Sequence, residues 1–295
     1  MGLDRAVVFL HVPKTAGSTL RQVLRRRFAP GEVWAPDVPG GGAGERPYLR
    51  YLRGEAGRTG LEPGNPNDRY LRTLAELPPD RVREMRLLLG HFWFGIHEAL
   101  PIPSTYVTML RDPVSRVLSL YAHRRAHHGI DRSLEHYLTE RRDWEIDNGQ
   151  TRRLAGRGHG GDVRFDPATD AMLDLAKRHL RDAVSVVGVT ERFDDFVAML
   201  GEEFGWRRLT YVSRNVSRER LREPDLSEDV LRTIRAHNEL DVELYRHATG
   251  LIAERAASLD PPLEDRVRAI RRRSAVVRKV RPAAVRLRRV LPRRG

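Results

Sequence analysis

A short apolar run, followed at once by a loop of small and hydroxylated residues, constrains the fold most strongly. Residues 7–10 (VVFL) are rich in β-forming side chains and predict a buried strand. Leu20, Val23 and Leu24 then recur at helical spacing, and Pro30-Gly31 ends the predicted helix. A strand, a tight loop and a helix in this order are typical of a parallel α/β sheet.

Later segments repeat this alternation. Apolar runs at 86–90, 105–110 and 184–189 predict three further strands, and helical spacing follows the last two of them. Residues 36–68 hold many Gly and Pro and predict an irregular insertion, which we expect on the acceptor side of any active site. The sequence therefore predicts one α/β domain over residues 1–265, with a parallel sheet covered by helices on both faces.

The net charge of +13 is concentrated at the end of the 295-residue chain. Residues 266–295 contain twelve Arg, one Lys and no acid, so the other 40 basic residues equal the 40 acidic ones in number. Basic and apolar residues alternate in this tail, with breaks expected at Pro282 and Pro292. The pattern fits an amphipathic helix on an anionic membrane surface, a segment that binds a polyanionic acceptor, or a merely solvated extension. Nucleic acid is disfavoured, because aromatic residues are absent from the tail.

Cysteine is absent from the whole sequence, which excludes a disulfide framework and a thiolate metal site. No secretory signal opens the chain, and no run approaches the roughly 20 apolar residues of a membrane span. The sequence thus predicts a cytoplasmic protein, peripheral at the membrane if the tail binds there.

The loop after the first strand has the composition of a phosphate cradle. Small residues let backbone N–H groups approach an anion, the following helix N-terminus adds partial positive charge, and Lys14 adds a full charge. The loop is not a Walker motif, since Lys14 precedes the glycine by three positions. The alternative is structural, with Thr15 or Ser18 capping the helix. The predicted anion-binding residues are Lys14, Thr15, Ala16, Gly17, Ser18 and Thr19.

A second candidate anion site follows the strand at 105–110. Arg111 stands at the strand end, where a guanidinium can fork onto a phosphate, and Ser119 lies about two helical turns further on. The alternative is that Asp112 caps the helix, Arg111 is a surface charge and Ser119 packs.

Together, PKTAGST after the first strand and RDPxxRxxSxY after a later one resemble the sulfotransferases that use 3′-phosphoadenosine 5′-phosphosulfate. The chain is most similar to their carbohydrate-type branch, which includes the heparan sulfate 2-O-sulfotransferases. Residues 90–95, 148–156 and 187–193 resemble bacterial members of this branch, and the likeness extends over about residues 6–250. The resemblance implies a P-loop-NTPase-like fold and a 5′-phosphosulfate bound by residues 14–19. It also implies a 3′-phosphate bound by Arg111 and Ser119 and covered by Arg214, Asn215 and Ser217.

Sulfuryl transfer to a hydroxyl needs a base, and His91 directly follows a predicted strand. An unperturbed histidine pKa of about 6.5 suits that task, and the resemblance implies the same role for the His of this GH pair. The alternative is a buried histidine bonded to backbone. Lys14 would stabilise the leaving phosphate, and no metal is required. His97, Gln150, Thr151 and Arg152 are the candidate acceptor-side residues.

The predicted function is therefore transfer of a sulfuryl group from 3′-phosphoadenosine 5′-phosphosulfate to a hydroxyl of a carbohydrate or related metabolite. One alternative is a P-loop-type kinase, which the position of Lys14 and the lack of a plausible Walker B carboxylate disfavour. The other is a non-enzymatic protein that binds a polyanion or membrane through its tail.

Overall fold

A computed structural model describes residues 3–36, 52–53, 65–140, 143–156, 164–212 and 223–290, with side chains described up to residue 278. Most of the insertion predicted at 36–68 lies outside the described residues. Arg214, Asn215 and Ser217, predicted to cover the 3′-phosphate, lie outside them as well.

A five-stranded sheet forms the centre of the molecule, in the order β2-β3-β1-β4-β5, and every strand pair is parallel. The four predicted strands are confirmed, and the two-residue edge strand β2 was not predicted because so short a run has no period. The strands are β1 (Ala6–Leu10), β2 (Val33–Trp34), β3 (Leu87–Gly90), β4 (Ser104–Leu110) and β5 (Val184–Val189).

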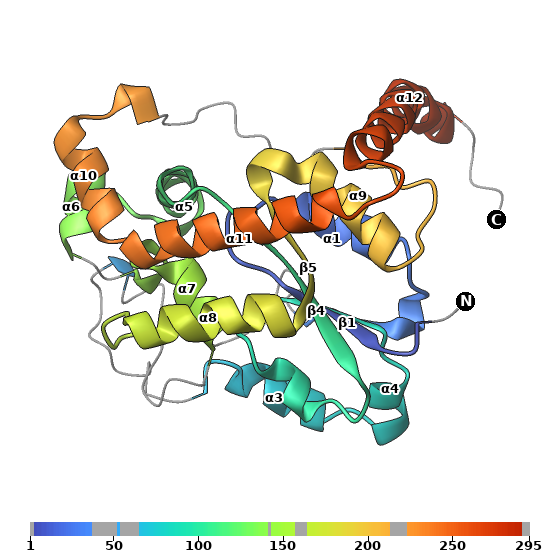
Figure 1. Ribbon diagram of the computed structural model, residues 1–295, viewed down its shortest axis with the longest axis horizontal. Helices are drawn as coiled ribbons and strands as arrows, with labels where there is room; N and C mark the ends of the chain where they lie inside the picture. The colour runs from blue at the N-terminus through green and yellow to red at the C-terminus, as the bar shows by residue number, and fades with distance from the viewer. Residues whose placement is uncertain are drawn as a thin grey trace.

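Helices cover both faces of this sheet, with α1 and α9 on one side and α8 and α11 on the other (Figure 1). The α/β fold class with helices on both faces is therefore confirmed. The helices are α1 (Gly17–Arg25), α3 (Asp68–Ala75), α4 (Pro79–Arg83), α5 (Pro113–His128), α6 (Leu134–Glu140), α7 (Gly149–Ala155), α8 (Asp170–Asp182), α9 (Phe193–Glu203), α10 (Glu228–Ala236), α11 (Glu239–Ala257) and α12 (Leu263–Val290), with short 3₁₀ turns η1 (Pro30–Glu32), η2 (Ile96–Ala99), η3 (Trp144–Ile146), η4 (Thr190–Arg192) and η5 (Glu223–Asp225).

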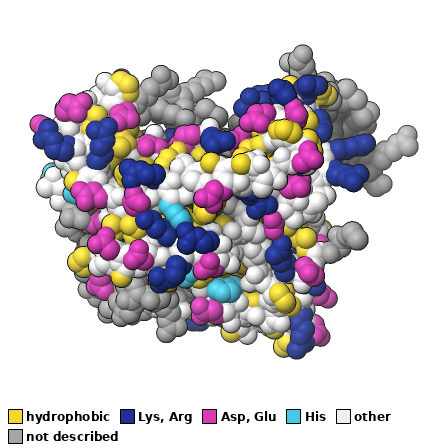
Figure 2. Space-filling model, in the orientation of Figure 1, with side chains coloured by type: hydrophobic (Ala, Val, Ile, Leu, Met, Phe, Trp, Pro, Cys, Tyr) yellow, Lys and Arg dark blue, Asp and Glu magenta, His cyan; other side chains and the backbone are white. Residues whose placement is uncertain are grey.

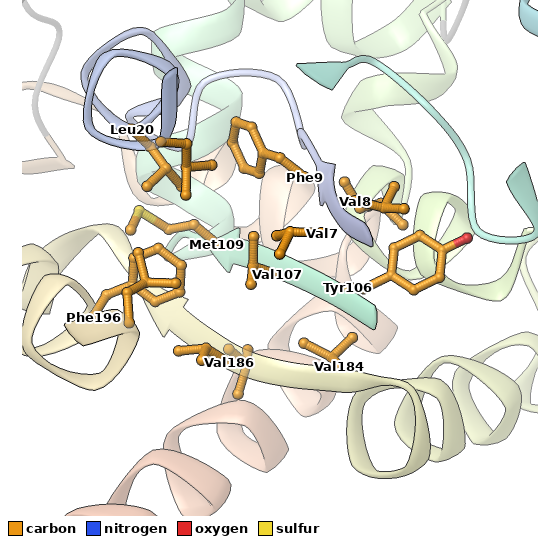
Figure 3. Close-up of a cluster of buried hydrophobic side chains, with 14 of the residues drawn as sticks. Val7, Val8, Phe9, Leu20, Tyr106, Val107, Met109, Val184, Val186 and Phe196 are labelled. Carbon is orange, nitrogen blue, oxygen red and sulfur yellow. The ribbon is translucent and has the colours of Figure 1, made fainter. Parts of the chain in front are cut away.

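The main core lies between the sheet and the helices on its two faces. Figure 3 shows Leu20 of α1 and Phe196 of α9 pointing toward Met109 and Val107 of β4. Side chains alternate along a strand, so Tyr106 faces the other side of the sheet. A second apolar cluster joins α5, α6 and α10. The two clusters fix α1 and α5, whose N-termini follow the β1 and β4 loops.

Helix α12 continues the domain before it extends away from it. Leu263, Val267 and Ile270 are buried in the main core, and the predicted domain boundary at residue 265 falls inside this helix. The helix also runs through Pro282, where the sequence predicts a break; proline keeps a helical φ and removes one backbone donor. Dark blue side chains gather along α12, whereas basic and acidic side chains are interspersed over the rest of the visible face (Figure 2).

Candidate functional site

Three of the predicted functional segments follow three adjacent strands. In the sheet register Leu10, the last residue of β1, pairs with Gly90 of β3 and with Thr108 of β4. The Lys14 loop, His91 and Arg111 begin just beyond these strand ends. Since the strands are parallel, the three segments meet at the carboxyl edge of the sheet, where ligands of open α/β sheets bind.

The loop from β1 to α1 has an unusual backbone. Lys14 and Ala16 both adopt a positive φ, at 70° and 60°, which side-chain-bearing residues rarely do. The Thr15 hydroxyl donates to the Val12 carbonyl at 2.8 Å and holds this shape. Ala16 stands at the N-cap of α1, and its methyl side chain makes no cap hydrogen bond, so neither Thr15 nor Ser18 occupies the N-cap position itself. A strained loop that is fixed by its own hydrogen bond and leads into a helix N-terminus is typical of an anion site.

A glycine is required at position 17 because of His11. A Cβ built on Gly17 would lie 1.7 Å from Nε2 of His11, so any other residue at this position would displace the buried ring. The β1 end and the helix N-terminus can therefore approach closely only with glycine here.

Arg111 joins the two motifs directly. Its Nη1 donates to the carbonyl oxygen of Lys14 at 3.2 Å. Asp112 caps α5 by accepting from the Ser115 N–H at 2.8 Å, as the structural alternative predicts. Arg111, however, is half-buried against the Lys14 loop and is not an isolated surface charge. Ser119 is half-buried two turns along α5. The structure therefore brings Arg111 and the Lys14 loop together.

His91 lies against the same loop. Its ring stacks on that of His11 with centroids 4.2 Å apart, and its Nδ1 is 3.2 Å from the His11 carbonyl oxygen. A carbonyl can only accept, so Nδ1 carries the proton in this bond, and in the neutral ring the lone pair is on Nε2. This is the tautomer in which Nε2 acts as a base.

The charge of Lys14 reaches two histidines that are not among the predicted site residues, His123 and His11. Burial, followed by the charge of Lys14, lowers the pKa of His123 to about 3. His123 is on α5, four residues and about one turn beyond Ser119, so the two side chains share a face of the helix. This spacing from a predicted site residue is the sequence signal that could have identified His123. Burial also lowers the pKa of His11 well below 6.5, with smaller contributions from His91, Arg21, Arg153 and Lys14.

His97 is engaged elsewhere. Its Nδ1 lies 2.8 Å from the Tyr106 hydroxyl, which also accepts from the backbone N–H of His97 and of Gly95. Tyr106 pairs with Val8 in the middle of β1 and not with the residue at its carboxyl end. The structure thus places His97 beside the middle of the sheet, and its acceptor-side role stays a prediction.

The three predicted acceptor-side residues of α7 are buried. Gln150 and Thr151 have no exposed surface and Arg152 is 2% exposed. Gln150 bonds to the backbone of Arg111, while Arg152 donates to the carbonyls of Asp147 and Asp166 at 2.6 and 2.7 Å. Their contacts are thus with the protein itself, and a role in acceptor binding stays a prediction.

The buried neutral His11 predicts acid sensitivity. The unfolded chain binds a proton at His11 below about pH 6.5, whereas the folded protein does not, because its pKa is lowered. The free energy of unfolding therefore decreases as the pH falls below about 6.5. One such group lowers it by up to about 1.4 kcal/mol per pH unit. We expect the free energy of unfolding, measured by urea titration at pH 6.5, 5.75 and 5, to fall less steeply for His11→Gln than for the wild type. Parallel slopes would contradict the assignment of His11 as neutral.

Comparison with known proteins now decides the family. The family model described as galactose-3-O-sulfotransferase matches residues 3–284, which is nearly the whole chain. The chain belongs to this family. A crystal structure of a sulfotransferase from Alicyclobacillus acidocaldarius is similar over 85% of this chain and 97% of that one, at 17% identity and a TM-score of 0.39. The comparison with curated proteins gives no match.

Family membership confirms the predicted sulfotransferase of carbohydrate type, and hence an enzyme of the transferase class. Among the described residues, no group of three or more histidine and carboxylate side chains is arranged to hold a metal ion. Within the same ranges, no helix combines the length and apolarity that a membrane span requires.

Proposed function

We propose that this galactose-3-O-sulfotransferase-family protein transfers a sulfuryl group from 3′-phosphoadenosine 5′-phosphosulfate to a sugar hydroxyl, with His91 as the general base. The observation that carries this proposal is the meeting of the Lys14 loop, Arg111 and His91 at one edge of the sheet. The family name makes the 3-hydroxyl of galactose the first acceptor to test.

The residues present fit such a donor. The backbone of residues 14–19 would hold the 5′-phosphosulfate, since the loop is fixed by Thr15 and leads into the N-terminus of α1. Arg111 and Ser119 would hold the 3′-phosphate from the β4 end and from α5. When bound, the donor supplies an activated sulfuryl group whose bond to the phosphate oxygen is the one that breaks.

His91 removes the acceptor proton in this scheme. Nε2 takes the proton of the sugar hydroxyl while the acceptor oxygen forms its bond to sulfur and the sulfur–oxygen bond to the phosphate breaks. The products are a sulfate ester and 3′-phosphoadenosine 5′-phosphate. Lys14 offsets the negative charge that develops on the leaving phosphate. His11, kept neutral by burial, lets His91 accept a proton without a second positive charge stacked against it.

Removal of the Arg111 guanidinium should weaken nucleotide binding selectively. We expect Arg111→Ala to reduce affinity for 3′-phosphoadenosine 5′-phosphate by about 30- to 100-fold, the loss of a charged, forked hydrogen bond. Affinity for adenosine 5′-monophosphate, which lacks the 3′-phosphate, should change little. Titration calorimetry with both nucleotides measures the difference.

The exposed Arg83 provides a matched control, because Arg83→Ala removes the same charge at a distant helix end. Equal losses for the two nucleotides in Arg111→Ala would contradict the 3′-phosphate assignment. Activity that requires ATP and Mg²⁺ would favour the kinase alternative. Deletion of residues 266–295 tests the non-enzymatic alternative. That alternative would be favoured if the deletion abolished all anion binding and the remaining domain bound no nucleotide.

A further inference from the structure

The backbone of Arg111 is held by a side chain from another element. Arg111 is the first residue beyond β4, where the ladder to β5 ends at the pair Leu110 and Val189. The Gln150 amide oxygen accepts from the Arg111 N–H at 2.9 Å, and the amide nitrogen donates to the Arg111 carbonyl at 2.9 Å. These are the two hydrogen bonds that a neighbouring strand would make. Gln150 therefore fixes the Arg111 backbone one residue past the sheet.

One helical turn further along α7, Arg153 holds the segment that contains His91. Its Nη1 donates to the carbonyls of His91 at 2.7 Å and of Phe92 at 3.2 Å. The Arg153 carbonyl accepts from the Phe94 N–H at 3.1 Å, and its guanidinium lies 4.6 Å from the Trp93 ring centre. The peptide that follows His91 Cα is thus tied to α7. The peptide that precedes it is tied to the start of the Lys14 loop, because the His11 N–H donates to the Gly90 carbonyl at 3.3 Å.

Helix α7 is itself fixed by buried charges. The Asp241 carboxylate of α11 accepts from the backbone N–H of Gln150 at 3.1 Å and of Thr151 at 2.7 Å, which caps the helix. Arg153 also pairs with Glu145. These side chains are buried, so their hydrogen bonds and ion pairs are stronger than they would be in water. Buried side chains of this kind act on substrates only through the residues they hold.

We infer that α7 sets the distance between donor site and base, with Gln150 as the positioning residue for Arg111 and Arg153 as the positioning residue for His91. This inference rests on the proposed roles of Arg111 and His91. It predicts that substitutions at two residues three positions apart on one short helix affect different quantities, nucleotide affinity for Gln150 and kcat for Arg153. A general loosening of α7 would alter both quantities together.

The experiment compares Gln150→Met and Arg153→Met in the full chain. Gln150→Met keeps the side-chain volume but removes both bonds to Arg111. We expect its affinity for 3′-phosphoadenosine 5′-phosphate to fall about 10-fold, with kcat at saturating donor within about threefold of the wild type. Arg153→Met should show the reverse, a kcat about 10-fold lower with nucleotide affinity unchanged. Arg153→Lys, which keeps an N–H donor for the carbonyls, should recover part of the kcat.

Two further measurements separate positioning from stability. In an Arg111→Ala background, Gln150→Met should weaken nucleotide binding no further, because the group it positions is gone. Arg255 offers a matched control: it also donates to a strand carbonyl, that of Ser185, and pairs with Glu203, but near the start of β5 and away from the site edge. Arg255→Met should lower the unfolding free energy with neither kinetic effect.

The outcomes distinguish this inference from the function on which it rests. If Arg111→Ala weakens nucleotide binding while Gln150→Met does not, the positioning role of Gln150 is wrong and the donor site stands. If His91→Ala loses turnover while Arg153→Met does not, the role of Arg153 is wrong. If each variant lowers affinity and kcat alike, α7 is only structural. If the wild-type protein binds no such nucleotide, both the inference and the proposed function fall.

Discussion

His91→Ala is expected to lower kcat by about 10²- to 10⁴-fold, the usual contribution of a general base. Affinity for 3′-phosphoadenosine 5′-phosphate should stay within about twofold of the wild type, because His91 meets the acceptor proton and not the nucleotide phosphates. The stack on His11 and the Nδ1 bond to the His11 carbonyl support this role, since they orient the ring and leave the basic lone pair on Nε2. Steady-state assays with galactose-containing acceptors, together with calorimetry, measure the two quantities.

His136 is a suitable control for this variant. It is an exposed histidine of α6 paired with Glu140, so His136→Ala changes the same residue type at a surface remote from the sheet edge. It should leave both quantities unchanged. The base assignment would be abandoned if His91→Ala kept wild-type kcat, or if its turnover fell only in step with a loss of nucleotide affinity.

The strands could be predicted because each is a short run of β-forming apolar residues between breakers. Because strands alternate with helices, the ends of β1, β3 and β4 are expected at one sheet edge, and the sequence alone was enough to group Lys14, His91 and Arg111 there. The edge strand β2 and the continuity of α12 into the core could not be predicted, since both depend on packing partners far away in the sequence.

The division of labour inside the motifs could not be predicted either. For the second arginine of RDPxxRxxSxY no role was predicted. Arg116 is fully buried between Glu145 and Asp241, while Arg111, the predicted phosphate ligand, reaches the Lys14 loop. In residues 148–156, the side chains of Gln150 and Arg152, which suggest an acceptor site, bind backbone groups of the protein. Asp241, the carboxylate that caps α7, is about 90 residues away in sequence, and no local pattern reveals such a pairing.

The largest stability effect is expected at Arg116. Its Nη1 lies 3.3 Å from the Glu145 carboxylate and its Nη2 3.6 Å from that of Asp241, and its side chain has no solvent exposure. Arg116→Met would leave the Asp241 carboxylate charged and buried. The backbone N–H groups of Gln150 and Thr151 would still donate to it, but its cationic partner would be gone. Breaking a buried pair in this way costs about 3–5 kcal/mol. Urea unfolding at pH 7.5 should show a loss of that size.

Arg83→Met is the matched comparison, because the Arg83–Asp80 pair has the same chemistry on an exposed helix end. An exposed pair contributes about 0–1 kcal/mol, so that variant should unfold almost like the wild type. Similar losses for the two variants would mean that the charges around Arg116 are not desolvated as the structure indicates. A large loss confined to Arg116→Met would instead identify the second motif arginine as the buried ion that joins α5, η3 and α11.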